Sequence, residues 1–365
     1  MHKILDISLT ATAGILILSL ALSLWLIPSP DFSEEENRAL SGIPRLNIAT
    51  VLDGSFSEDL SQYLSDRLPL RLSFIRLRTL SEILLTKGEC NGVIYCKDGY
   101  LLDRGEYREL YTAEKKISRI SSLSTALEAQ GVPTVTAYVP RGIDVMTSKL
   151  PPLYQGNQNK IFELIFQSAE QIDLLTPLKN AAEENSYVWH KTDHHWTTQG
   201  AYIAYLTLSD PLGYTPYPAD FFTPQRVSDS FLGSIYSRGG CLPTSKDSID
   251  LYRYEGDEDY IITIDQNETY NSFYFLKNLK KKDKYAVFLG GNFASVTIEK
   301  KGGDPRPRLL VIKDSFANSL TPFLALHFDI ELVDPRFYSS YEELYSKAQG
   351  FDAALIIQGL DTVAT

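Results

Sequence analysis

The chain has 365 residues, of which 44% are hydrophobic and 22% charged, an ordinary composition for a folded protein. Its formal net charge of −11 opposes contact with a phosphate backbone and argues against nucleic-acid binding. The three cysteines form no C-x-x-C pair, which argues against a zinc or dithiol redox motif. Cys90 and Cys96 are close enough for a hairpin disulfide, with Cys241 left over, and the spacing leaves this pairing open.

An uncharged segment occupies residues 7–27, about the length needed to cross the ~30 Å hydrocarbon core of a bilayer. Lys3 precedes it and Asp31 with three glutamates follows it, which favours an N-terminus on the inside. A cleaved signal peptide is the alternative, but no small-x-small cleavage pattern follows the apolar stretch. We therefore expect residues 1–30 to form a cytoplasmic tip and a single transmembrane anchor in the cell membrane, with the rest of the chain extracytoplasmic.

Residues 31–110 are predicted to form a juxtamembrane linker region, which opens with a charged stretch punctuated by proline and glycine. Apolar residues at near-helical spacing predict an amphipathic helical stretch over residues 56–85. Residues 92–102 then predict a hairpin that turns around Lys97, Asp98 and Gly99.

Helices and strands alternate from about residue 111 to residue 365, which is typical of an open α/β sheet with helices on both faces. Helical patterns cover residues 114–129, 159–172 and 198–208, the last with Thr197 as its N-cap. Strands are predicted at residues 134–139 and 187–190, and short apolar runs typical of buried parallel strands lie at residues 285–289, 309–312, 330–333 and 353–357. The Tyr-, Asp- and Ser-rich stretch at about 210–280 is expected to be an insertion of hairpins and loops.

A cluster of histidines indicates where a general base is to be sought, because histidine titrates near neutral pH. Three of the five histidines lie within six residues, at His190, His194 and His195. Asp193 and His195 are two positions apart, so in an extended segment they face the same side. The carboxylate can then accept from one ring nitrogen of His195 while the other faces a substrate, as in a catalytic triad. His194 is expected to point the opposite way.

A metal site is an alternative interpretation, because aspartate and histidine together can bind zinc or manganese. Adjacent His194 and His195 cannot easily converge on one ion from an extended chain, and the cysteines offer no further ligands. A purely structural turn before a capped helix is a second alternative. The sequence favours a general base that works without a metal or another cofactor.

A strand-to-helix turn at Ser315 is the second feature with catalytic potential. The apolar run at 309–312 leads into Lys313, Asp314 and Ser315, and a helical pattern follows. This order places the Ser315 hydroxyl at the carboxyl edge of the sheet, next to free N–H groups of the first helical turn that could stabilise negative charge. The alternative is that Asp-Ser only caps the helix.

Two further turns are expected to reach the same edge of the sheet, where α/β proteins bind their ligands. Gly291 and Asn292 follow the run at 285–289 and offer a close backbone approach and an amide donor, although an ordinary glycine-rich turn explains them equally well. Arg336 and Tyr338 follow the run at 330–333. We assign Asn292 to an oxyanion, and Arg336 or Tyr338 to an incoming glycan or acyl donor. Alternatively, Arg336 pairs with a nearby acid such as Asp334 and Tyr338 belongs to the core.

The pentapeptide TDHHW at residues 192–196 resembles the signature of the DHHW proteins, which are related to the SGNH-like O-acetyltransferases of alginate and other bacterial exopolysaccharides. The resemblance covers most of the chain beyond residue 30. It continues through EENRAL (35–40), VPRGID (139–144), FLGGN (288–292) and KDSF (313–316). The chain departs from it at Arg141, where related proteins favour lysine, and in KDSF, where SGNH hydrolases have Gly-Asp-Ser.

The resemblance implies a flavodoxin-like, SGNH-hydrolase-type catalytic domain over residues 111–365. It implies a triad of Asp193, His195 and Ser315, in an order permuted relative to ordinary SGNH hydrolases. The implied activity is extracytoplasmic O-acetyl transfer through an acyl-enzyme to a surface polysaccharide, with a membrane-bound O-acyltransferase as the source of the acyl group. A carbohydrate esterase with the same triad and a non-catalytic envelope binding or assembly protein are the alternatives.

Overall fold

A computed structural model describes residues 30–36, 38–104, 110–152, 154, 171–242, 244–339, 343–344 and 348–364, with a few positions between 10 and 22. The predicted anchor at 7–27 lies mostly outside these residues, as does the predicted helix at 159–172. In the part of the chain that is described, no helix is long and apolar enough to cross a bilayer. The chain divides into two compact units, residues 1–91 with 237–243 and residues 92–236 with 244–365.

The first unit contains short strands and helices. They are β1 (Phe32–Ser33) and β2 (Arg38–Ala39), which pair antiparallel, α2 (Ile48–Leu52), α3 (Ser55–Arg67), α4 (Arg71–Glu82), the π-helical turn η1 (Ile83–Lys87) and β3 (Glu89–Cys90). The helical spacing predicted over 56–85 is confirmed, but as successive helices, because Leu70 takes a left-handed φ of 59° between α3 and α4. Buried Asp66 of α3 accepts hydrogen bonds from Arg38 at 2.9 Å and from Ser41 N at 2.9 Å, which fastens the EENRAL segment to the helices.

The second unit begins with the predicted hairpin. β4 (Val93–Tyr95) and β5 (Leu101–Asp103) pair antiparallel around the 3-10 turn η2 (Lys97–Gly99), which confirms the prediction. The other helices are α5 (Leu110–Ala129), α6 (Gly142–Val145), α8 (Leu175–Glu183), α9 (Thr198–Thr207), α10 (Ser209–Leu212), α11 (Ser234–Arg238), α12 (Ala317–Leu324) and α14 (Leu360–Ala364). The other 3-10 turns are η3 (Thr147–Lys149), η4 (Ala219–Phe221), η5 (Leu276–Lys280), η6 (Tyr285–Val287) and η7 (Pro335–Phe337).

A seven-stranded mixed sheet forms the centre of this unit, in the order β10-β9-β11-β13-β12-β14-β6. Its strands are β6 (Thr134–Val139), β9 (Tyr260–Ile264), β10 (Glu268–Tyr270), β11 (Ser295–Lys300), β12 (Arg308–Lys313), β13 (Asp329–Val333) and β14 (Ala353–Gly359). β13, β12, β14 and β6 run parallel, which confirms four predicted strands, whereas β9, β10 and β11 pair antiparallel. The sheet is mixed because β11 pairs antiparallel with β13, and the β9–β10 hairpin of the predicted insertion extends that edge. A separate pair consists of β7 (Thr223–Phe231) and β8 (Asp247–Arg253).

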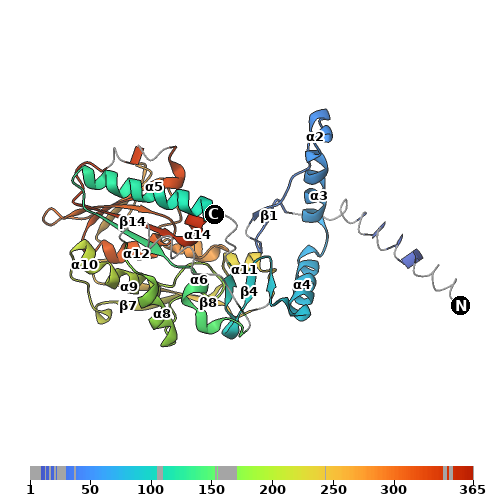
Figure 1. Ribbon diagram of the computed structural model, residues 1–365, viewed down its shortest axis with the longest axis horizontal. Helices are drawn as coiled ribbons and strands as arrows, with labels where there is room; N and C mark the ends of the chain where they lie inside the picture. The colour runs from blue at the N-terminus through green and yellow to red at the C-terminus, as the bar shows by residue number, and fades with distance from the viewer. Residues whose placement is uncertain are drawn as a thin grey trace. The chain divides into compact units, whose positions relative to one another are not determined.

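Helices cover both faces of the sheet, as predicted (Figure 1). Side chains alternate along β12, with Leu309 and Val311 in one apolar core and Leu310 and Ile312 in the other. The first core also contains residues of α8, α9 and α12, and the second contains residues of α5 and α14. This burial on both faces explains the continuous apolar runs of the central strands.

Two predicted strands are wrong. Residues 285–287 form the 3-10 turn η6, and the run cannot continue as a strand because Leu289, Gly290 and Gly291 all have positive φ values, from 58° to 130°. The strand in this part of the sheet is β11, which was not predicted. Residues 187–190 make only an isolated bridge, between Trp189 and Trp196. Both runs are apolar because their side chains fill the core beneath a loop.

Candidate active site

The TDHHW segment lies on a loop that is closed at its base by the Trp189–Trp196 bridge. Asp247, at the start of β8, shapes this loop: its carboxylate is 1% exposed and accepts from Lys191 N at 2.6 Å and from Thr192 N at 2.8 Å. After the loop, Thr197 accepts from Gly200 N and caps α9, as predicted. A buried carboxylate that is distant in sequence therefore holds the loop by accepting hydrogen bonds from the backbone N–H groups of the loop.

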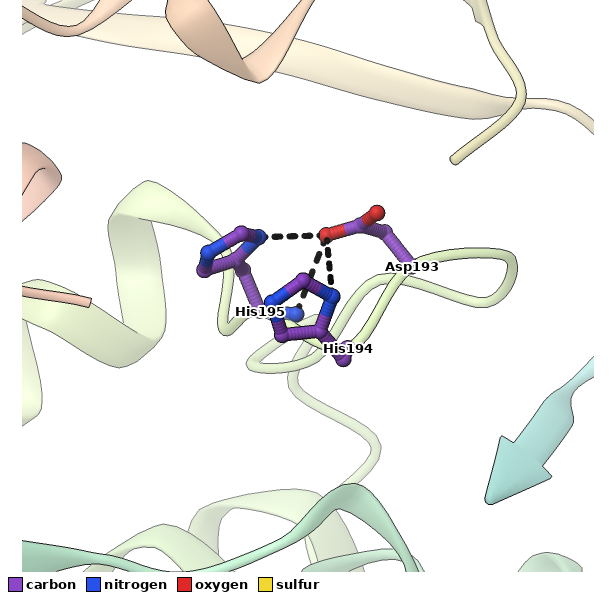
Figure 2. A group of neighbouring side chains, drawn as sticks. All are labelled: Asp193, His194 and His195. Carbon is purple, nitrogen blue, oxygen red and sulfur yellow. Dashed lines mark hydrogen bonds and ion pairs between the residues drawn. The ribbon is translucent and has the colours of Figure 1, made fainter. Parts of the chain in front are cut away.

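Asp193 and His195 lie together at the tip of this loop (Figure 2). Asp193 Oδ1 lies 2.5 Å from His195 Nδ1 and accepts from the His195 backbone N–H at 3.1 Å. Asp193 Oδ2 accepts from the backbone N–H and the hydroxyl of Ser234, at 2.8 and 3.0 Å. The carboxylate is thus held at both oxygens, and the predicted contact between Asp193 and His195 is confirmed.

His194 does not point away from this pair, contrary to the prediction. Its ring lies 3.8 Å from the His195 ring, centroid to centroid, and its Nδ1 lies 3.7 Å from Asp193 Oδ1 and 2.7 Å from Ser234 Oγ. Residues 191–195 form bends, so the alternation of an extended strand does not apply to them. Figure 2 shows both imidazoles beside the carboxylate.

These three side chains also bring one ligand atom each to within 4.8 Å of one another, so the prediction that the histidines cannot converge is wrong. A metal ion would nevertheless compete with existing bonds. Asp193 already binds Ser234 and His195, and both ring nitrogens of His195 are engaged. The bonding pattern suits a hydrogen-bonded base better than a metal centre.

Ser315 meets His195 from the opposite side of the ring. Its Oγ lies 2.7 Å from His195 Nε2, and Ser315 occupies the turn between β12 and α12, as predicted. Asp314 fixes this turn: Oδ1 accepts from Phe316 N at 3.1 Å, and Oδ2 accepts from Gly359 N, at the end of β14, at 2.7 Å. The N–H of Phe316 is therefore not free to bind an oxyanion, which corrects that part of the prediction.

Aromatic side chains enclose the histidine. The Tyr285 ring stacks on His195 with centroids 3.8 Å apart and planes 6° apart, and Phe316 contacts the ring at 5.0 Å. The Trp196 indole donates to Phe316 O at 3.1 Å and to Ser319 Oγ at 2.9 Å. The tryptophan of TDHHW thus ties the histidine loop to the helix that follows Ser315.

The site is electrostatically set for a neutral histidine beside an ionised aspartate. Burial, together with the neighbouring His194, lowers the pKa of His195 to about 3, although Asp193 acts in the opposite direction. Burial alone would raise the pKa of Asp193, but the two histidines and the bonds from His195 and Ser234 hold it well below its ordinary value. At neutral pH, His195 can therefore accept a proton.

The residues predicted to bind an oxyanion, Gly291 and Asn292, lie beside the turn that carries Ser315. Gly291 O accepts from Asn318 Nδ2 at 3.1 Å, and Asn292 Oδ1 accepts from Lys313 Nζ at 3.1 Å and from Asn318 Nδ2 at 3.3 Å. Lys313 and Asn318 flank Ser315 in sequence, so Gly291 and Asn292 are held against the segment that carries Ser315.

Arg336 and Tyr338 have other partners. Arg336 Nε donates to Asp334 Oδ1 at 2.8 Å, as the alternative interpretation expected, and its side chain is 46% exposed. The Tyr338 hydroxyl donates to Ala294 O at 3.2 Å, and the ring packs against the second core. Neither residue makes a hydrogen bond to the Asp193, His195 and Ser315 group.

Sequence reasoning missed the residues that support the site from elsewhere in the chain. They are Asp247, Ser234, Tyr285 and Asn318. Ser234 and Asp247 lie 41 and 55 residues from the loop residues that they bind, and no local pattern marks them.

Comparisons with known proteins show which sequences this chain resembles. Residues 175–333 match the family model of the DHHW proteins, and residues 93–227 match that of the SGNH hydrolase-like domain of the acetyltransferase AlgX. Over residues 175–333 the chain therefore resembles the DHHW proteins, and the match to the second model relates it distantly to the alginate O-acetyltransferases.

Two relatives are similar in sequence to different shares of this chain. A probable alginate O-acetylase AlgJ of Pseudomonas fluorescens is 24% identical over 234 residues, which cover 60% of this chain and 57% of that protein. The AlgJ of Pseudomonas syringae pv. tomato is 27% identical over 182 residues, which cover 46% and 45%. The chain therefore spans about half the length of these relatives.

The fold is shared with two solved structures. A DHHW family protein from Eubacterium siraeum is 20% identical with a TM-score of 0.61, over 76% of this chain and 93% of that one. Bacillus cereus PatB1, solved with a sulfonyl adduct, is also 20% identical with a TM-score of 0.61, over 75% and 97%.

Proposed function

We propose that this protein is an O-acetyltransferase that carries the acyl group on Ser315 and passes it to a hydroxyl of a cell-surface polysaccharide. The observation that supports this function best is the continuous relay from Asp193 Oδ1 through both nitrogens of His195 to Ser315 Oγ, with steps of 2.5 and 2.7 Å. A serine, a histidine and a carboxylate in this arrangement form an activated nucleophile.

The reaction has two symmetrical halves. Ser315 Oγ attacks the carbonyl carbon of the acyl donor, and its proton passes to His195 Nε2; when the tetrahedral intermediate collapses, that proton goes to the departing alkoxide. A sugar hydroxyl then gives its proton to His195 and attacks the acyl-enzyme, and Ser315 recovers the proton as its ester bond breaks. Asp193 keeps Nδ1 protonated, so that Nε2 is the basic nitrogen in both halves.

The developing oxyanion requires hydrogen-bond donors. Asn292 is the proposed side-chain donor, because its oxygen already faces Lys313 and Asn318 and its NH2 group donates to no other described residue. Gly291 provides the close backbone approach, with a φ of 130° and no atom within 4 Å of the position a Cβ would occupy. Arg336, partly exposed beside Asp334, is the proposed contact for the incoming glycan or donor, with Tyr338 behind it.

The acceptor, the donor and the location are proposed by analogy with the O-acetylases that this chain resembles. A surface polysaccharide would be the acceptor, and a membrane-bound O-acyltransferase would supply the acyl group without a cofactor in this chain. The uncharged segment at 7–27 would anchor the protein in the cell membrane with its catalytic unit outside the cytoplasm. Protease treatment of intact cells tests this topology: the catalytic unit should be digested while a cytoplasmic marker survives.

Intact-mass spectrometry after incubation with an aryl acetate tests the chemistry. We expect one added acetyl group, mapped to Ser315 and absent from the Ser315→Ala variant. A variant of the exposed Ser230, Ser230→Ala, is the control and should be acetylated like the wild type. Release of the acetyl group to a glycan hydroxyl identifies a transferase, whereas release only to water identifies an esterase. Equal ester turnover by Ser315→Ala and the wild type would contradict both and leave a binding protein.

A further inference from the structure

Lys313 is a buried cation next to the nucleophile for which the triad has no use. It is the last residue of β12 and is 1% exposed. Its ammonium donates to Asn318 Oδ1 at 2.8 Å and to Asn292 Oδ1 at 3.1 Å. Burial of a lysine ammonium has a large desolvation cost, so the contacts of Lys313 indicate which role offsets that cost.

The chemistry of the ammonium group decides how both amides are oriented. An ammonium has three donors and no acceptor, so Asn292 and Asn318 must each turn an oxygen toward Lys313. Asn318 Nδ2 then donates to Asn292 Oδ1 at 3.3 Å and to Gly291 O at 3.1 Å, which fills the remaining space around the Asn292 oxygen. With its oxygen fixed inward by two donors, Asn292 must present its NH2 group outward.

We propose that Lys313 is a positioning residue that locks the Asn292 amide with its NH2 group facing the oxyanion formed at Ser315. This inference rests on the proposed acyl transfer and deepens it. A neutral amine in the same place has a lone pair that can accept from an amide NH2, so loss of the proton would allow Asn292 to turn over. Activity should therefore require the protonated form of Lys313.

The charges around Lys313 place its titration in an accessible pH range. Burial lowers the pKa of Lys313 to about 8, with Arg336 acting in the same direction and Asp334 and Asp314 opposing it. Its other polar neighbours, Asn292 and Asn318, are neutral. The ammonium is thus charged at neutral pH and loses its proton with a midpoint near pH 8.

A pH series of kcat/KM for an aryl acetate, corrected with Ser315→Ala as the blank, tests the proposal without altering Lys313. We expect wild-type activity to fall above about pH 8. Asn292→Ala should be slower by about 10²-fold at pH 7 and should show no fall between pH 7 and 10, because nothing remains for Lys313 to orient. A wild-type rate that stays level to pH 10, or an Asn292→Ala rate that still falls, overturns the role of Lys313.

Variants of Lys313 provide an independent measurement. Lys313→Met should lower kcat by about 10²-fold with little change in KM, and the double variant with Asn292→Ala should be no slower than either single variant. Lys300→Met, at an exposed position of β11, is the control and should keep wild-type activity. Losses that multiply in the double variant would show that Lys313 acts independently of Asn292 and overturn the proposal. If Lys313→Met does not fold, the pH series decides. Equal activity of Ser315→Ala and the wild type would instead refute the acyl-enzyme itself.

Discussion

Asp193 is the residue on which the state of His195 depends, because its two oxygens have separate tasks. Oδ2 is committed to the backbone and hydroxyl of Ser234, which leaves Oδ1 for the ring of His195. The fit is close: a Cβ added at Gly233 would lie 2.3 Å from Asp193 Oδ2. A side chain at position 233 would therefore displace the carboxylate, and an ionised carboxylate beside Nδ1 favours the tautomer of His195 that is protonated at that nitrogen.

We expect Asp193→Asn to lower kcat on the order of 10³–10⁴-fold while leaving the fold intact. The asparagine oxygen would stay with the two donors of Ser234, so its NH2 group would face His195 Nδ1 and move the proton to Nε2. That nitrogen could then no longer accept from Ser315. Asp229→Asn, at a side chain that is 72% exposed, is the matched control. A rate within threefold of wild type for Asp193→Asn would show that the carboxylate does not orient the base.

The sequence could predict that Asp193, His195 and Ser315 lie together because the signals for them are local. An i, i+2 carboxylate–imidazole pair and a serine after a buried strand are each visible within a few residues. Ser234 and Tyr285 gave no such signal, since a serine near a glycine and a tyrosine in an apolar run have many other uses. The prediction for the orientation of His194 was wrong for a related reason. The backbone of the loop is bent and hydrogen-bonded to Asp247, which is distant in sequence.

Strands could be predicted from the sequence where burial in the sheet is the reason for their apolar composition. β6, β12, β13 and β14 are buried on both faces, so their continuous apolar runs marked them clearly. The run at 285–289 has the same composition for a different reason, because Tyr285 stacks on His195 and the chain then turns through left-handed residues. β11 escaped notice because it is antiparallel and ends in exposed Glu299 and Lys300.

The loop between Trp189 and Trp196 depends on β8 through Asp247, which gives a prediction at the scale of the element. Asp247→Ala would leave the buried N–H of Thr192 and the N–H of Lys191 without their acceptor, at a cost of about 1–3 kcal/mol for each buried group. We expect a lower free energy of unfolding in urea and a lower kcat. On the same strand, Asp250→Ala removes a partly exposed ion pair with Arg226, worth at most about 1 kcal/mol, and is the control. Equal losses in both variants would contradict this assignment.

Two histidines of the second unit, the buried His195 and the half-buried His327, have lowered pKa values, which makes the stability of this unit depend on pH. His327 lies among tyrosine rings. Its Nε2 is 2.8 Å from the Tyr205 hydroxyl, and its ring stacks on that of Tyr214 with centroids 4.4 Å apart. Burial, with a smaller contribution from Arg306, lowers the pKa of His327 to about 4, and that of His195 is lowered to about 3. In an unfolded chain both would titrate near 6.5. Between these values the unfolded state binds more protons, so stability is lost as the pH falls.

We therefore expect the midpoint of thermal unfolding to stay nearly level between pH 7 and 8, below the range in which Lys313 titrates, and to fall as the pH is lowered from 6.5 to 4. His327→Gln keeps an acceptor for the Tyr205 hydroxyl but cannot be protonated, so its midpoint should fall less steeply over the same range. Below pH 4 the midpoints of the two proteins should fall with the same slope, because His195 and Asp193 continue to titrate in both. Calorimetry at half-unit steps measures this difference directly. Identical slopes for the two proteins between pH 6.5 and 4 would show that His327 is not held neutral, and that the acid sensitivity originates elsewhere in the fold.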